Sequence, residues 1–279
     1  MSLWRTVSLT LVCAMAGGCG TAPPPPVPPA SRPPAPARTS PEAPATATAA
    51  AATSSPSPSA TARRGTAKPV TAAERYGWTT VVARDDFTGT RLHESWGAYD
   101  SAGNSGEGRR SPDQIKVRDG VLTMTGTADG VTAGMEWDHA RRYGRWEIRA
   151  RFPAGCGCYH PVLILWPDDD PWPEGGEIDY AEVFDARRAR LHFFLHYGPD
   201  NQQIGGSKAV DMTRWHAYAV EWTPTRITGY LDGEPFFRTT RRGAFPPGRM
   251  EQTIQLDWFP DGSGGTASLQ VDWAAIYAL

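Results

Sequence analysis

Apolar and polar side chains alternate along most of the chain after about residue 76. The clearest runs cover 146–152, 216–222, 254–258 and 269–273. A period of two is typical of strands that bury one face. Two Asp-Gly pairs, at 119–120 and 232–233, adjoin such runs and indicate hairpin turns. The pattern therefore predicts an all-β fold, either a sandwich or a barrel.

One segment departs from the alternation. Residues 162–166 form a continuous apolar run, which favours a strand buried on both faces. No long stretch has the periodicity of a helix. The part of the chain with these patterns, about 205 residues, is long enough for one sandwich domain.

The N-terminus is typical of an export signal. Arg5 precedes a mostly apolar run at 7–16, which is too short to span a bilayer. The small residues Ala16-Gly17-Gly18 before Cys19 resemble a bacterial lipobox, although Ala16 stands where Leu is usual. We expect cleavage before Cys19 and a lipid anchor on its thiol, so that the protein is held on the membrane at the cell surface. Ordinary signal cleavage with free secretion is the alternative.

A segment rich in Pro, Ala, Ser and Thr follows the signal. Fourteen of the 26 prolines lie within residues 20–70, and such a composition favours extended conformations and cannot bury a core. After a lipid anchor it is best interpreted as a spacer. We therefore predict a signal peptide at 1–19, a disordered linker at 20–74 and a catalytic domain at 75–279.

The charge of the domain limits its partners. The chain has 28 basic and 30 acidic side chains, of which seven and two lie in residues 1–75, so residues 76–279 have a net charge of −7. A mildly acidic domain argues against nucleic-acid binding, which depends on basic surfaces. It is compatible with a neutral polysaccharide. We expect a monomer.

Four cysteines provide little framework. Cys13 and Cys19 lie in the signal, and Cys156 and Cys158 are separated by one residue. An exported protein permits disulfides, so a bridged pair and a free pair both remain open. A zinc site has less support because no further Cys-x-x-Cys pair is present.

Three carboxylates stand within six residues, in Glu177-Ile-Asp179-Tyr-Ala-Glu182. On a strand Glu177 and Asp179 share a face, and Glu182 joins them only if Tyr180 or Ala181 bulges out. The two glutamate Cα atoms would then lie about 13 Å apart. Their side chains could lean together to roughly the 5–5.5 Å of a retaining glycosidase pair. A solvated acidic strand or a metal-binding cluster is the alternative.

This motif and its surroundings resemble glycoside hydrolase family 16, in the bulged form Glu-x-Asp-x-x-Glu. Further landmarks in the expected order are Asp86-Phe87, Trp96, 144–151, 165–167, Trp172-Pro173, 195–197 and 218–222. The resemblance covers residues 76–279. It implies a jelly-roll (concanavalin A-like) β-sandwich with a saccharide cleft across its concave sheet.

The resemblance also assigns chemistry. It implies endo-acting hydrolysis of a β-linked polysaccharide with retention, with Glu177 as nucleophile, Glu182 as general acid/base and Asp179 holding Glu177. It requires no cofactor. A structural calcium ion is common in the family, and Asp86 and Asp272 are possible oxygen donors here.

Five side chains are candidates for substrate binding. Trp166 and Trp172 flank an acidic loop before the motif, and exposed Trp rings pack on the apolar faces of sugars. His196 follows on a candidate strand, where a neutral imidazole could bind a sugar hydroxyl or tune Glu182; a core histidine is the alternative. Family members often have a substrate-contacting Asn or Arg in the loop that here holds Asn104 and Arg110. Gln255 stands where many relatives have Asn.

The leading hypothesis is a surface-tethered endo-β-1,3-glucanase. By the resemblance, the bulged motif favours β-1,3-glucan over the substrates of lichenases and xyloglucan enzymes. A transglycosylase would differ only in whether water or a sugar hydroxyl intercepts the glycosyl-enzyme. A carbohydrate-binding module or lectin with the same sandwich is the alternative from another class, and a structural envelope protein is a third.

Overall fold

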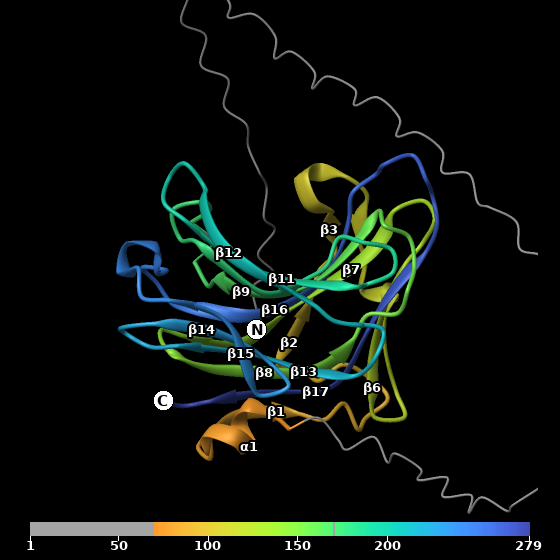
Figure 1. The fold of residues 1–279 in the computed structure, drawn as a ribbon. Helices are drawn as coiled ribbons and strands as arrows, with labels where there is room; N and C mark the ends of the chain where they lie inside the picture. Colours follow the sequence, from red (N-terminus) through yellow and green to blue (C-terminus); the bar gives the residue numbers. More distant parts are fainter. Residues whose placement is uncertain (1–69, 170) are drawn as a thin grey trace, which may run out of the picture. The chain divides into compact units, whose positions relative to one another are not determined.

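The computed structural model describes residues 70–169 and 171–279. These residues form two β-sheets packed face to face, with short helices at the margins (Figure 1). The predicted all-β sandwich is confirmed.

One layer is an eight-stranded sheet with the order β15-β14-β13-β8-β17-β6-β5, in which β1 also pairs with β17. Its strands are β1 (Val81–Asp85), β5 (Ile115–Arg118), β6 (Val121–Gly126), β8 (Gly144–Arg151), β13 (His216–Trp222), β14 (Ile227–Leu231), β15 (Glu234–Thr239) and β17 (Ala267–Tyr277). Both predicted Asp-Gly hairpins lie here, between β5 and β6 and between β14 and β15.

The other layer is a nine-stranded sheet with the order β12-β11-β10-β9-β16-β7-β4-β3, in which β2 also pairs with β7. Its strands are β2 (Trp96–Ala98), β3 (Ser101–Ala102), β4 (Arg109–Arg110), β7 (Val131–Arg141), β9 (Tyr159–Pro167), β10 (Glu177–Glu182), β11 (Arg190–Tyr197), β12 (Gln202–Ala209) and β16 (Met250–Trp258). The three carboxylates lie on β10 of this sheet.

The hydrophobic core fills the space between the sheets. On β8 it takes Trp146, Ile148 and Ala150, as the alternation predicts, and on β16 it takes Ile254 and Leu256. The opposite faces of these strands remain available for other contacts. On the nine-stranded sheet that face carries the polar side chains described below.

The continuous apolar run forms β9, near the middle of the nine-stranded sheet. Leu163 and Leu165 belong to the core, while Val162 and Ile164 are buried without belonging to it. A strand that is buried on both faces cannot alternate with polar residues, which explains why the run is unbroken.

The folded part begins earlier than predicted. The predicted linker extended to residue 74, but helix α1 (Ala72–Tyr76) packs on the outer face of the eight-stranded sheet, where Ala72 is buried with Trp78 and Tyr230. The Thr71 hydroxyl accepts from Glu74 N and the Glu74 carboxylate accepts from Thr71 N, which closes a capping box. Alanine and threonine are common in linkers, so composition alone misplaced this boundary.

Short 3-10 turns complete the described fold: η1 (Asn104–Gly106), η2 (Pro112–Gln114) and η3 (Arg242–Ala244). Among residues 70–169 and 171–279, no helix has the length and apolar character needed to cross a membrane. The predicted signal, the lipidation site Cys19 and nearly all of the predicted linker lie outside the described residues.

Candidate active site

The register of β10 places the three carboxylates on one face. Asp179 lies opposite Ile164 of β9 and Ala181 lies opposite Leu163, so Tyr180 is the extra residue on this side. The side chains of Tyr180 and Ala181 both enter the core. Two consecutive inward residues restore the alternation for Glu182, which therefore returns to the face of Glu177 and Asp179.

The extra residue is fixed by a buried hydrogen-bond network. The Tyr180 hydroxyl donates to Gln252 Oε1 at 2.7 Å, and Gln252 Nε2 donates to the carbonyls of Ile164 and Thr253 at 3.1 and 2.8 Å. This network joins β10 to β9 and β16 beneath the carboxylates. It holds the bulge in place at the level of the core.

The carboxyl groups are close enough to affect one another strongly. A hydrogen bond links the side chains of Glu177 and Asp179. Burial is the largest cause that raises the pKa of each group, followed by the charge of Asp179 on Glu177, of Glu182 on Asp179, and of Glu177 on Glu182. The pKa of Glu182 is raised to about 8. Three such groups cannot all ionise near neutral pH, so they titrate together and the cluster retains protons.

A fourth carboxylate, Asp257 of β16, lies on the same face and is buried. Its charge raises the pKa of Glu177, Asp179 and Glu182. Arg110 Nη2 donates to Asp257 Oδ1 and to Gln255 Oε1, each at 2.6 Å. The predicted binding residue Arg110 therefore reaches the site, although the sequence did not single out Asp257. On a strand with a period of two, Asp257 shares a face with Gln255, and this spacing is the feature of the sequence that could have indicated Asp257 as a site residue.

His196 lies in the site, next to Asp179. The antiparallel register sets His196 opposite Glu177 and His192 opposite Glu182. His196 Nε2 is 3.2 Å from Asp179 Oδ2, and Nδ1 is 2.7 Å from Asn201 Oδ1. His196 lowers the pKa of Glu177, whereas burial and the charges of Asp179 and Asp257 raise it. His196 therefore contacts Asp179 and lies opposite Glu177, whereas His192 lies opposite Glu182; the predicted contact of His196 with a sugar hydroxyl stays a prediction.

The two predicted tryptophans meet beside Glu177. Trp166, at the end of β9, stacks on Trp172 with ring centroids 5.2 Å apart, and Trp172 lies 5.6 Å from the His196 ring. Trp172 is exposed for 38% of its surface, so it is not a core residue. An exposed ring of this kind, next to a carboxylate row, matches what sugar stacking requires.

Comparison with known proteins identifies the family. The protein-family model described as "Glycosyl hydrolases family 16" matches residues 105–275 of the sequence, which is more than half of the chain. The chain belongs to glycosyl hydrolases family 16. This family 16 chain is 30% identical over 200 residues to "Beta-glucanase" of Rhodothermus marinus, covering 62% of this chain and 66% of that protein. It is 31% identical over 166 residues to "Glucan endo-1,3-beta-glucosidase A1" of Niallia circulans, covering 49% and 24%. The chain thus spans just under two thirds of the length of the Rhodothermus marinus protein and about a quarter of the length of the Niallia circulans protein.

Solved structures share the fold. The laminarinase of Rhodothermus marinus superposes with a TM-score of 0.61 at 24% identity, covering 71% of this chain and 97% of that one. LamAcat of Zobellia galactanivorans superposes with a TM-score of 0.63 at 18% identity, covering 72% and 99%. The family 16 sandwich is accordingly a jelly roll, as the resemblance implied.

The described contacts of three other predicted residues do not involve the carboxylates. Asn104 starts η1, and its described hydrogen bond, from Ser105 Oγ at 2.9 Å, stays within the loop. Asp86 accepts from Arg84 at 3.0 and 2.6 Å, and Asp272 accepts from Arg149. Each of the two carboxylates named as a possible calcium donor is thus paired with an arginine, and a calcium ion bound by them stays a prediction.

The two cysteines left open by the sequence are joined. Cys156 and Cys158 form a disulfide that closes a ring across Gly157. The buried Arg188 donates to the carbonyls of Cys156 and Tyr159 at 3.1 and 2.9 Å, which ties the ring to the start of β9.

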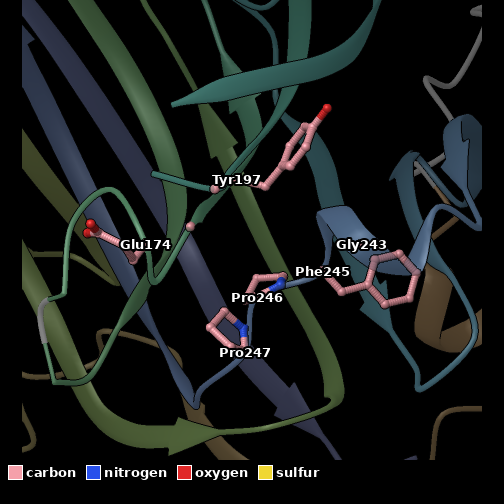
Figure 2. A pocket seen from close by; sticks show the side chains of 8 residues that line it. Glu174, Tyr197, Gly243, Phe245, Pro246 and Pro247 are labelled. Carbon is pink, nitrogen blue, oxygen red and sulfur yellow. The ribbon is translucent and has the colours of Figure 1, made fainter. Parts of the chain in front are cut away.

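A small cavity lies at one end of the sandwich, next to the loop that carries Trp172. It has a volume of about 210 Å³. Glu174, Tyr197, Phe245, Pro246 and Pro247 surround it together with glycines (Figure 2). None of the three carboxylates lines it, so we place the chemistry on the open face of the nine-stranded sheet and not in this cavity.

Proposed function

We propose that this protein is an endo-acting glycoside hydrolase that cleaves β-1,3-glucan with retention of configuration. One observation carries the proposal. The bulge in β10 brings Glu177 and Glu182 to the same face of a sheet, with Asp179 between them, and this is the face opposite to the one that buries Ile178, Tyr180 and Ala181 in the core.

The two glutamates have different neighbours on β11, His196 opposite Glu177 and His192 opposite Glu182, which bears on the different tasks that the resemblance assigns to them. A pKa of about 8 keeps the Glu182 carboxyl protonated near neutral pH, as a general acid requires. Burial and the charges of Asp179 and Asp257 raise the pKa of Glu177 as well, and His196 acts against them, in the direction of the ionised form that a nucleophile requires. In the first step Glu177 attacks the anomeric carbon while Glu182 protonates the departing oxygen. In the second step Glu182 removes a proton from water, which displaces Glu177 from the sugar.

The substrate rests on the relatives. The names of the relatives at 30% and 31% identity refer to β-glucanase and endo-1,3-β-glucosidase activity, and two structures with the same fold are those of a laminarinase and of LamAcat. Together with the uncharged rings of Trp166 and Trp172, this favours a neutral β-1,3-glucan. A sugar-binding protein without activity would have no use for three buried carboxyl groups, whose burial costs stability.

Azide rescue tests the two assignments separately. Glu177→Ala protein with azide should form an α-glycosyl azide, because azide attacks from the face that the nucleophile leaves vacant. Glu182→Ala protein, given an aryl β-glycoside of laminaribiose and azide, should form the β-glycosyl azide, because azide then intercepts the glycosyl-enzyme. The reverse pair of products would exchange the roles of the two residues.

Product configuration tests the mechanism as a whole. The full chain should release β-configured reducing ends from laminarin at the earliest time points in proton NMR, before mutarotation. First products in the α configuration would contradict the retaining mechanism. Binding of laminarin without any new reducing ends would favour the lectin hypothesis.

We further propose that the protein is exported and anchored by a lipid on Cys19, with the proline-rich segment as a spacer. The support is the sequence alone: a charged start, a short apolar run and small residues before Cys19. Cys19→Ser should move the protein from the membrane fraction to the soluble or secreted fraction, and intact mass should lose the lipid. An unchanged distribution would favour free secretion.

A further inference from the structure

A second group of rings lies at the other end of the carboxylate row, beside Glu182. We call it the Glu182-side ring cluster; it consists of His160, Phe184, His192, Phe194 and Phe259. Phe184 and Phe259 are each exposed for 37% of their surface. Single exposed rings are ordinary on a protein surface, but rings that gather in one contiguous patch are typical of a ligand-binding or partner-binding surface.

The rings of the cluster contact one another in sequence. Phe259 stacks on His160 at 4.3 Å between centroids, His160 meets Phe184 at 5.0 Å, and Phe184 meets His192 at 4.7 Å. His192 and Phe194 then lie nearly parallel, 5.8 Å apart. They come from β9, β11 and the segments after β10 and β16, so separate parts of the chain converge on one aromatic surface.

The register ties this surface to the proposed general acid. His192 lies directly opposite Glu182 on β11, and Val162, two residues after His160, lies opposite it on β9. Phe184 follows Glu182 by two residues. Phe194 lies opposite Asp179, so the cluster extends from the middle of the carboxylate row, past Glu182, to the rings of Phe184, His160 and Phe259.

The two histidines of the cluster behave as uncharged rings. Burial, with Arg188 nearby, lowers the pKa of His160 to about 4, and burial lowers that of His192. Backbone contacts hold the surface: Phe259 N donates to the carbonyl of Cys158 at 2.7 Å, and Gly155 N donates to that of Ala186 at 3.2 Å. An uncharged and anchored aromatic surface suits the apolar face of a neutral sugar.

We propose that the Glu182-side ring cluster is a second stacking surface for the glycan chain, which contacts sugar units beyond the scissile bond on the side opposite Trp166 and Trp172. The continuity of rings supports it, because Phe194 meets His196 at 6.3 Å and so connects the two aromatic groups across the carboxylate row. The proposal rests on the function proposed above. Two separated stacking surfaces require a substrate long enough to reach both.

Binding measurements on an inactive background test this proposal. The Glu177→Gln chain would be titrated calorimetrically with laminarioligosaccharides of increasing length. Phe184→Leu and Phe259→Leu would then be added singly and together; leucine keeps an apolar side chain but removes the flat ring. We expect the double change to weaken binding of the long oligosaccharides roughly tenfold and to leave that of laminaribiose unchanged. Tyr76→Leu, which removes an exposed ring at the end of helix α1, is the matched control and should change neither.

The outcomes separate the two proposals. Equal affinities with and without the double change, in protein that binds long oligosaccharides, would overturn the second stacking surface alone. Failure of the Glu177→Gln chain to bind any laminarioligosaccharide would overturn the proposed substrate and the stacking surface with it. Equal weakening at every length would also overturn the surface, because it would place the rings at the reaction centre. Thermal unfolding of each variant shows that it is folded under the conditions of the titration.

Discussion

Arg110 Nη2 donates to Asp257 Oδ1 at 2.6 Å, and this ion pair lies buried beside the proposed catalytic carboxyls. Asp257 raises the pKa of Glu177, Asp179 and Glu182 through its charge. Arg110 limits that effect because it offsets the charge of Asp257. The pair therefore sets how tightly the carboxyl cluster holds its protons.

The first prediction concerns the pH profile of activity. Glu182 must be protonated to act as an acid, so kcat/KM should fall as pH rises through about 8. Asp257→Asn removes a negative charge, which lowers the pKa of Glu182 and moves this alkaline limb to lower pH. Arg110→Gln leaves Asp257 without its partner, which raises the pKa of Glu182 and moves the limb to higher pH. The measurement is kcat/KM on laminarin from pH 4 to 10.

The opposite directions make this pair of variants informative. A general loss of structure would reduce activity at every pH without moving the limb. Displacement of both variants in the same direction would contradict the electrostatic role of the ion pair. Arg110→Lys keeps the charge and should leave the limb in place.

The second prediction concerns the bulge. Tyr180→Phe removes the hydroxyl that donates to Gln252 Oε1 and leaves that buried oxygen without this donor. The free energy of unfolding should fall by about 1–3 kcal/mol. The rate constant kcat should fall as well, because the same contact fixes the residue that returns Glu182 to the face of Glu177. Urea unfolding and initial rates on laminarin measure the two effects.

A double change separates stability from position. Tyr180→Phe with Gln252→Leu removes the donor and the acceptor together, so part of the stability lost in the single variant should return. The recovery of kcat should remain incomplete, since β10 is still detached from β16 at this level. Full recovery of kcat along with stability would show that the contact does not position Glu182.

The third prediction concerns Trp172, which is exposed for 38% of its surface and stacks on Trp166. Trp172→Ala should raise KM for laminarin about tenfold, because one stacking contact is lost. Its effect on the melting temperature should be smaller than that of a core tryptophan, since Trp172 lies outside the hydrophobic core. Trp215→Ala, in the residue before β13 that packs against Arg149 and Arg151 of β8, is the control for removal of an indole. An unchanged KM in the Trp172 variant would exclude it from the binding surface.

Much of the β-structure follows from the sequence because each sheet buries only one face in the core. The alternation in 146–152 and 254–258 therefore marks strands β8 and β16 correctly, and the apolar run at 162–166 marks β9. The spacing of Glu177, Asp179 and Glu182 requires an extra residue, and the register shift at Tyr180 supplies it. Local spacing determined these features.

Contacts between distant segments could not be read in the same way. Asp257 alternates with apolar residues and so resembles a solvent-facing position, and only the pairing of β16 with β9 brings it near the motif. Likewise, His192 and His196 are four residues apart and both follow the motif closely in the sequence. Only the register between β10 and β11 determines that His192, and not His196, lies opposite Glu182. Phe259 joins the ring cluster through β16, far from β10 in the sequence.

The fourth prediction concerns Glu147, which the alternation would place on an exposed face and which is fully buried under α1. Glu147 Oε1 accepts from Ala72 N at 2.6 Å and Oε2 accepts from Ala73 N at 3.2 Å. Burial raises its pKa from 4.5 to about 7 against these hydrogen bonds. A pKa that is raised on folding stabilises the protein fully below about pH 4.5, and this contribution is lost as pH rises through about 7.

Glu147→Gln should remove this pH dependence because glutamine does not ionise. Between pH 5 and 8 the free energy of unfolding of the unaltered chain should fall by about 3 kcal/mol more than that of the variant. At pH 8 the variant should therefore be the more stable of the two, and at pH 5 it should be no more stable. Urea unfolding across this range measures the difference, with Glu234→Gln as control because Glu234 pairs with Arg75 at the surface. Parallel curves for the unaltered chain and the Glu147 variant would show that Glu147 titrates normally and that α1 is held by its apolar contacts alone.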